Sequence, residues 1–171
     1  MGYTIVAGFQ KTDMEWLHAL MDPFDTNKIP FGRDCDRDLA NRELDYHMTM
    51  FHWGREKDGI YLPKLDNFSS VPCEIVVTGV HEMHGREGSR LLYLSVSPTE
   101  SYEKLSRLLS GQMGAPISGF LHITLAVSKN PDKIRMIRHQ IRDTVTFPIS
   151  MKIERLDLYH IWRPTRKERS F

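Results

Sequence analysis

Two short runs of the sequence combine a histidine with a threonine two residues later, separated by an apolar residue. They read HMTM at 47–50 and HITL at 122–125. Imidazole exchanges protons near neutral pH, so one histidine can take a proton from an attacking oxygen while the other protonates a leaving oxygen. Threonine hydroxyls can donate hydrogen bonds to the charged oxygens of a phosphate. The two runs therefore predict cleavage of a phosphodiester without a metal ion.

Strand geometry explains the spacing within each run. Side chains of a strand alternate between its two faces, so each histidine shares a face with its threonine. The apolar residues between them point to the opposite face and can pack in a core. A single triplet of this kind is a weak signal, whereas two in matching places of a repeated unit are far more specific.

The elements around these runs form such a repeat. Each copy is an apolar strand, a capped helix and a strand with the histidine, first over Tyr3–Trp53 and again over Arg90–Ser128. We expect helices that open at Thr12 with a Glu15 capping partner, at Ser97 with Pro98 and Glu100 and an end near Gly111, and at Asn130-Pro131. Strands are expected at Tyr3–Phe9, Asp45–Trp53, Cys73–Val80, Arg90–Ser97, Phe120–Ser128 and Ile149–Trp162.

The polar stretches between these elements are expected to be loops. They are Asp22–Leu44, Gly54–Pro72 and the hairpin connection His81–Ser89. The order as a whole predicts one α+β domain over residues 1–171. It is bilobal and pseudo-two-fold, with antiparallel sheets around a central cleft, and residues 163–171 form a loose basic tail.

Composition narrows the class of protein. The chain is 40% apolar and 26% charged, its net charge is +1, and it has two cysteines. This balance disfavours long double-stranded DNA as a partner but allows a nucleotide or short RNA. No apolar run is long enough to cross a membrane, and the first ten residues lack the pattern of a signal peptide. We therefore expect a cytoplasmic monomer that does not bind membranes.

The two motif strands, about 75 residues apart, resemble those of the two-histidine (2H) phosphoesterase superfamily. That superfamily includes the LigT-like RNA 2',5'-ligases and cyclic nucleotide phosphodiesterases. The resemblance runs from the Tyr3 strand to Leu156-Asp157-Leu158-Tyr159, although the 22–44 loop is long for the family. It implies a phosphoric diester hydrolase without cofactor or metal, acting on 2',3'-cyclic, 2',5'-linked or cyclic-oligonucleotide bonds. His47 and His122 would be the acid and base, and Thr49 and Thr124 the phosphate ligands.

Further residues are candidate substrate contacts. Trp53 shares the face of His47 by strand alternation and could stack on a base, and a terminal aromatic group beside an arginine could do the same. Tyr93 and Ser95 lie on the strand face opposite Leu92 and Leu94. The full set of these candidates is Trp53, Tyr93, Ser95, Tyr159, Trp162 and Arg163.

Two other functions are open. The chain could be a catalytically silent RNA- or nucleotide-binding module of the same fold, although a binder has no need of two proton-transfer groups. It could also be a metal hydrolase built on His81 and His84, but this pair lacks the helical spacing of a hydrolase zinc site.

Overall fold

The structure, a computed structural model of the chain, describes residues 2–29, 40–43, 45–53, 65–68, 73–114 and 116–161. These residues form an α+β domain of strands and three α-helices, confirming the predicted class. The helices are α1 (Lys11–Met21), α2 (Glu100–Met113) and α3 (Pro131–Thr144), with 3-10 turns η1 (Leu65–Phe68) and η2 (Arg86–Gly88). The strands are β1 (Gly2–Phe9), β2 (Thr26–Ile29), β3 (Ala40–Glu43), β4 (His47–Trp53), β5 (Cys73–His84), β6 (Arg90–Pro98), β7 (His122–Ser128) and β8 (Ile149–Ile161).

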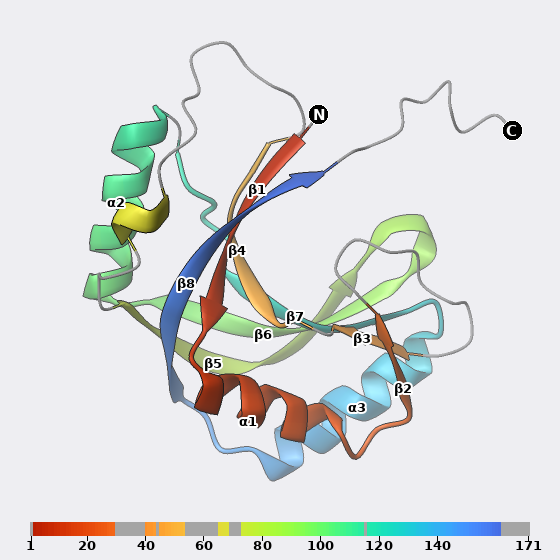
Figure 1. Cartoon of the computed structure of the whole chain (residues 1–171). Helices are drawn as coiled ribbons and strands as arrows, with labels where there is room; N and C mark the ends of the chain where they lie inside the picture. The colour runs from red at the N-terminus through yellow and green to blue at the C-terminus, as the bar shows by residue number, and fades with distance from the viewer. Residues whose placement is uncertain are drawn as a thin grey trace, which may run out of the picture.

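The strands of the described residues pair in the order β2-β3-β7-β4-β1-β8-β5-β6, and β6 also pairs with β7. Six of them, β7, β4, β1, β8, β5 and β6, thus form a continuous antiparallel circuit. In Figure 1, α1 and α3 lie below these curved strands and α2 lies to their left. The two motif strands, β4 and β7, are neighbours near the centre of the picture.

Several predicted boundaries are corrected. The 22–44 segment contains β2 and β3, which pair in parallel, and is therefore not all loop; residues 30–39 and 44 lie outside the described part. Strand β5 extends to His84, because its pairing with β6 continues as far as His84↔Arg90. His81 and His84 are consequently strand residues and not part of a loose connection.

The helix starts are only partly as predicted. Helix α3 begins as expected, with Pro131 in the first turn and Asn130 accepting a hydrogen bond from the backbone N–H of Asp132. Helix α1 begins at Lys11 after Gln10, which makes no side-chain capping bond, so the Thr12–Glu15 capping box is wrong.

Helix α2 starts later than predicted because β6 continues through Pro98, paired with β5. Its N-cap is Thr99, not Ser97, and the Thr99 hydroxyl accepts from the backbone N–H of Tyr102. The helix passes the expected end at Gly111 and stops before Gly114, whose positive φ of 67° suits glycine.

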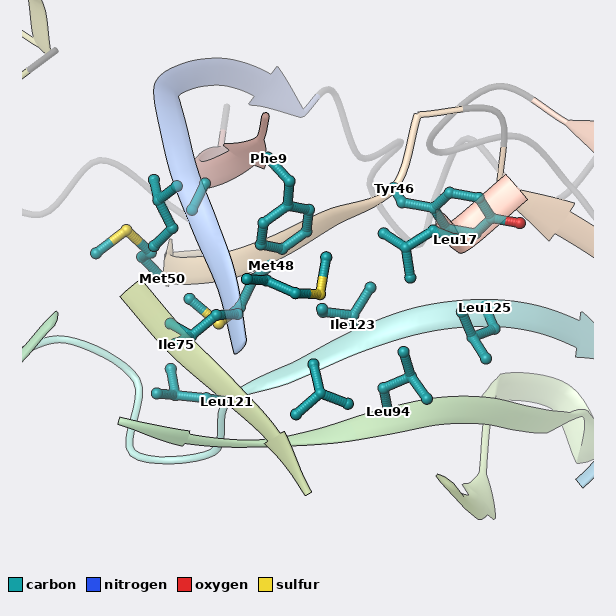
Figure 2. Packing of buried hydrophobic residues seen from close by; sticks show 14 of the residues in the cluster. Phe9, Leu17, Tyr46, Met48, Met50, Ile75, Leu94, Leu121, Ile123 and Leu125 are labelled. Atoms are coloured by element: carbon teal, nitrogen blue, oxygen red, sulfur yellow. The ribbon is translucent and has the colours of Figure 1, made fainter. Parts of the chain in front are cut away.

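A large hydrophobic core joins the two motif strands (Figure 2). Met48 and Met50 of β4 and Ile123 and Leu125 of β7 are all fully buried. The helices cover this core with residues spaced by three or four positions, as an amphipathic helix requires: Leu17 and Met21, Tyr102, Leu105 and Leu109, and Ile134, Ile137 and Ile141. Within the described residues, no helix has both the length and the apolarity to cross a bilayer.

Two halves of the strand circuit have matching registers. In β1–β4, Gly8 pairs with His47 and Val6 with Thr49, and Met50 is then skipped. In β6–β7, Ser95 pairs with His122 and Tyr93 with Thr124, and the residue after the threonine, Leu125, is skipped in the same way. The next strand of each half, β8 beside β1 and β5 beside β6, follows the same pattern. Strand β8 sets Arg155 and Asp157 beside Gly8 and Val6, and β5 sets Gly79 and His81 beside Ser95 and Tyr93.

Candidate functional site

The two His-x-Thr triplets meet where β4 and β7 pair. The register partners are Met48 and Ile123, both fully buried. In an antiparallel pair this register sets His47 beside Thr124 and Thr49 beside His122 on the opposite face. These four side chains are partly exposed, as expected for groups that a ligand must reach.

Each histidine ring faces the backbone carbonyl two residues before it. Nδ1 of His47 lies 2.8 Å from the Asp45 oxygen, and Nδ1 of His122 lies 3.5 Å from the Phe120 oxygen. A carbonyl only accepts, so the hydrogen is on Nδ1 and the neutral ring keeps a lone pair on Nε2. Both histidines can therefore exchange a proton through Nε2.

Burial lowers the pKa of both histidines. At His47, the hydrogen bond to the Asp45 carbonyl and the carboxylates of Asp45 and Asp157 act in the opposite direction, whereas Arg155 acts with burial. At His122, the contact with the Phe120 carbonyl raises the pKa and the charge of His47 lowers it. The charge of His47 is thus close enough to lower the proton affinity of His122.

The surroundings of His47 are charged. Arg155 donates from Nε to Asp157 at 2.8 Å and from Nη2 to the two Asp45 oxygens at 3.0 and 3.3 Å. Its side chain crosses Gly8, where an added Cβ would come within 2.8 Å of the Arg155 side chain. The Asp157 hydrogen bond and both carboxylates raise the pKa of Arg155. Arg155 therefore ties β8 to the residue that holds the His47 ring.

The surroundings of His122 are aromatic. The rings of Phe120 and His122 are 4.8 Å apart and inclined by 31°, and Tyr93 stands edge-on to both at 5.6 and 5.7 Å. His81 lies 5.7 Å from Tyr93. Ser95, opposite His122 in β6, donates to the Gly79 carbonyl at 3.3 Å and shares a 2.8 Å hydrogen bond with Thr78.

The structure brings only some of the predicted contacts to this site. Tyr93 and Ser95 flank the second triplet in β6 as expected. The register shift after Thr49 interrupts the strand alternation by which Trp53 was predicted to share the face of His47. The residue before it, His52, contacts the Thr4 hydroxyl at 2.7 Å. The side chains of Trp53 and Tyr159 lie outside the described part. Residues 162–171, which include Trp162, Arg163 and the predicted basic tail, lie outside it entirely.

The predictions missed five residues that border the histidines: Gly8, Asp45, Phe120, Arg155 and Asp157. Two of them, Asp45 and Phe120, stand two positions before a histidine, and this spacing could have identified them. The alternation of Arg155 and Asp157 on one strand face was a weaker signal, because such pairs are common on solvated strands.

A surface cavity in the described part of the chain lies away from the histidines. In the parts of the chain that are described, no three His, Cys, Asp or Glu side chains group closely enough to hold a metal ion. A surface cavity of about 640 Å³ lies between α2 and the segment that follows it, lined by residues such as Arg107 and Ile117. We place the candidate site at the histidines, because this cavity lacks an arranged proton-transfer pair.

Comparisons with known proteins add no family: the sequence matches no protein-family model and no curated protein.

Proposed function

We propose that this chain is a phosphodiesterase of the two-histidine (2H) type that cleaves its substrate without a metal ion. The observation that carries the proposal is the Met48–Ile123 strand pair, which sets both His-x-Thr triplets on one face. Two imidazoles whose Nδ1 atoms face backbone carbonyls would supply both proton transfers of hydrolysis. Two hydroxyls beside them supply donors for the phosphate oxygens.

The bilobal, pseudo-two-fold arrangement around a cleft is part of the same proposal. Its support is the position-by-position match of the two registers, which includes a skipped residue after each threonine. A second match lies in the strands next to these, where Glu154 of β8 and Thr78 of β5 have no register partner. Equal irregularities at equal places favour two copies of one unit over two unrelated strand sets.

The proposed reaction consumes one water and breaks one P–O bond. One histidine removes a proton from the water as its oxygen attacks phosphorus, and the other gives a proton to the departing ribose oxygen. Thr49 and Thr124 donate hydrogen bonds to the non-bridging oxygens as negative charge builds on them. The histidines end with exchanged protonation states, and proton exchange with solvent restores them.

The proposed substrates are 2',3'-cyclic, 2',5'-linked or cyclic-oligonucleotide phosphodiesters, of nucleotide or short RNA size. The net charge of +1 favours a short ligand over a long nucleic acid. We further propose that the protein works as a monomer in the cytoplasm. The buried free thiol of Cys73 suits a reducing compartment.

The test is turnover of a panel of these nucleotides by the full chain in excess chelator. We expect turnover that falls about 10²- to 10⁴-fold in His47→Ala and in His122→Ala. His84→Ala is the matched control, because this exposed histidine lies at the far end of β5. Turnover that survives loss of both histidines, or that needs a divalent ion restored, would refute the proposal. Tight nucleotide binding without product would instead identify a binding module.

A further inference from the structure

Phe120 is a large apolar side chain left half in solvent beside a proposed catalytic group. Its side chain is 52% exposed, although its ring stacks on that of His122. The other exposed large apolar side chains of the described residues, Leu108 and Met136, lie on helices α2 and α3. Phe120 differs from them because its ring lies against that of His122, a proposed catalytic residue.

Orienting the histidine does not require this aromatic ring. The backbone carbonyl of Phe120 faces Nδ1 of His122, and in the matching position the carbonyl of Asp45 does the same for His47. Asp45 shows that the position accepts a charged side chain. The core is also complete without Phe120, because Leu121 and Ile123 supply the buried side chains there. Its exposed ring is thus available to a ligand.

Tyr93 extends the aromatic surface. It stands edge-on to Phe120 at 72° and to His122 at 77°, and His81 continues the row on β5. The matching positions beside His47 carry Val6 and the charged network of Arg155, whereas the described aromatic contacts of Phe120 and Tyr93 lie beside His122. A neutral ring of a ligand would find stacking partners here and carboxylates on the other side.

We propose that Phe120 and Tyr93 form a stacking subsite for the nucleobase of the substrate, on the His122 side of the phosphate. This subsite rests on the proposed phosphodiesterase function and adds where the nucleoside lies. Rings bind bases through their faces and tolerate any base, because every base has a π-face. The subsite therefore takes both purine and pyrimidine nucleotides, and holds the larger purine surface more tightly.

The experiment measures binding of 2'-AMP and of inorganic phosphate by titration calorimetry, together with KM and kcat for 2',3'-cyclic AMP. We expect Phe120→Leu, which keeps an apolar side chain but has no ring, to weaken 2'-AMP binding roughly tenfold or more. Phosphate binding should not change. The variant Phe120→Trp, which still has an aromatic ring, should keep the 2'-AMP affinity of the wild type. Leu108→Ala is the matched control, because it removes another half-exposed apolar side chain on α2.

The outcomes separate the subsite from the hydrolysis. Equal 2'-AMP affinity in wild type and Phe120→Leu overturns the subsite, even if the wild type turns over cyclic nucleotides. A lower kcat with unchanged KM and 2'-AMP affinity also overturns it, because Phe120 would then only position His122. Selective loss of 2'-AMP binding in a chain without turnover supports the subsite and refutes the hydrolysis.

Discussion

The two halves of the strand circuit share a backbone pattern but surround their histidines with different side chains. Beside His47 lie Asp45, Asp157 and Arg155, joined by hydrogen bonds of 2.8 to 3.3 Å. Beside His122 lie the rings of Phe120 and Tyr93. The contrast teaches that matching strand registers can place two histidines alike, while the neighbouring side chains determine the chemical environment of each.

These surroundings favour different proton-transfer roles. Burial lowers the pKa of His47, but its carbonyl contact and the two carboxylates oppose that shift and stabilise the imidazolium formed when a base accepts a proton. Burial also lowers the pKa of His122, and a positive charge on His47 lowers it further. Proton uptake by His47 would therefore help His122 release its own. The assignment to be tested is that His47 is the base and His122 the acid.

The leaving group gives the strongest test of this difference. A ribose oxygen needs a proton to depart, whereas p-nitrophenolate does not. We expect His122→Ala to lose about 10²- to 10⁴-fold in kcat/KM on a 2',3'-cyclic nucleotide but little on a nucleotide p-nitrophenyl ester. His47→Ala should lose activity on both. The inverse pattern would exchange the roles, and equal losses on both esters would exclude a separate acid and base.

Local sequence pattern was sufficient for the motif strands and their core face. Alternation predicted that Met48 and Ile123 are buried while His47 and His122 face the other way, and both statements hold. The start of α3 was also predictable, because Asn130 and Pro131 are a specific local signal. These features depend on neighbours in sequence, which is why they were visible without the structure.

Features that depend on distant strands were not predictable. Whether Arg155 reaches Asp45 depends on pairing between β8, β1 and β4 and on the missing side chain at Gly8. The register shift after Thr49 likewise arises from pairing, and it interrupted the alternation that linked Trp53 to His47. Strand propensity alone contains no information about which strand lies next to which.

Two glycines, one in each half of the circuit, test how far the surroundings of His47 depend on Arg155. A Cβ at Gly8 would meet the Arg155 side chain at 2.8 Å, whereas at Gly79 the nearest atom is Nε2 of the exposed His81 at 3.1 Å. We expect Gly8→Ala to displace Arg155 from Asp45 and to lower kcat/KM about tenfold through the loosened His47. Gly79→Ala should change it little, because the His81 ring can move.

Melting temperatures and a third variant separate an effect on the position of His47 from a loss of protein stability. Arg155→Met should lose as much activity as Gly8→Ala, with little change in melting temperature, because partly exposed ion pairs add little stability. Arg138→Met is the matched control, because Arg138 of α3 also forms an ion pair with a carboxylate, that of Glu82 on β5. Equal activity losses in Gly8→Ala and Gly79→Ala would show that the Arg155 contact has no special role.

The pH profile tests the smallest expected difference between the halves. With His47 as base, the rate rises as pH increases through its lowered pKa; with His122 as acid, the rate falls through its own lowered pKa. The kcat/KM bell should therefore lie on the acid side of about pH 6.5. Asp45→Asn removes a carboxylate that raises the pKa of His47, so the rising limb should move to lower pH. Arg155→Met should move that limb the opposite way, because it removes a positive charge. A falling limb that moves instead would assign the charged half to the acid.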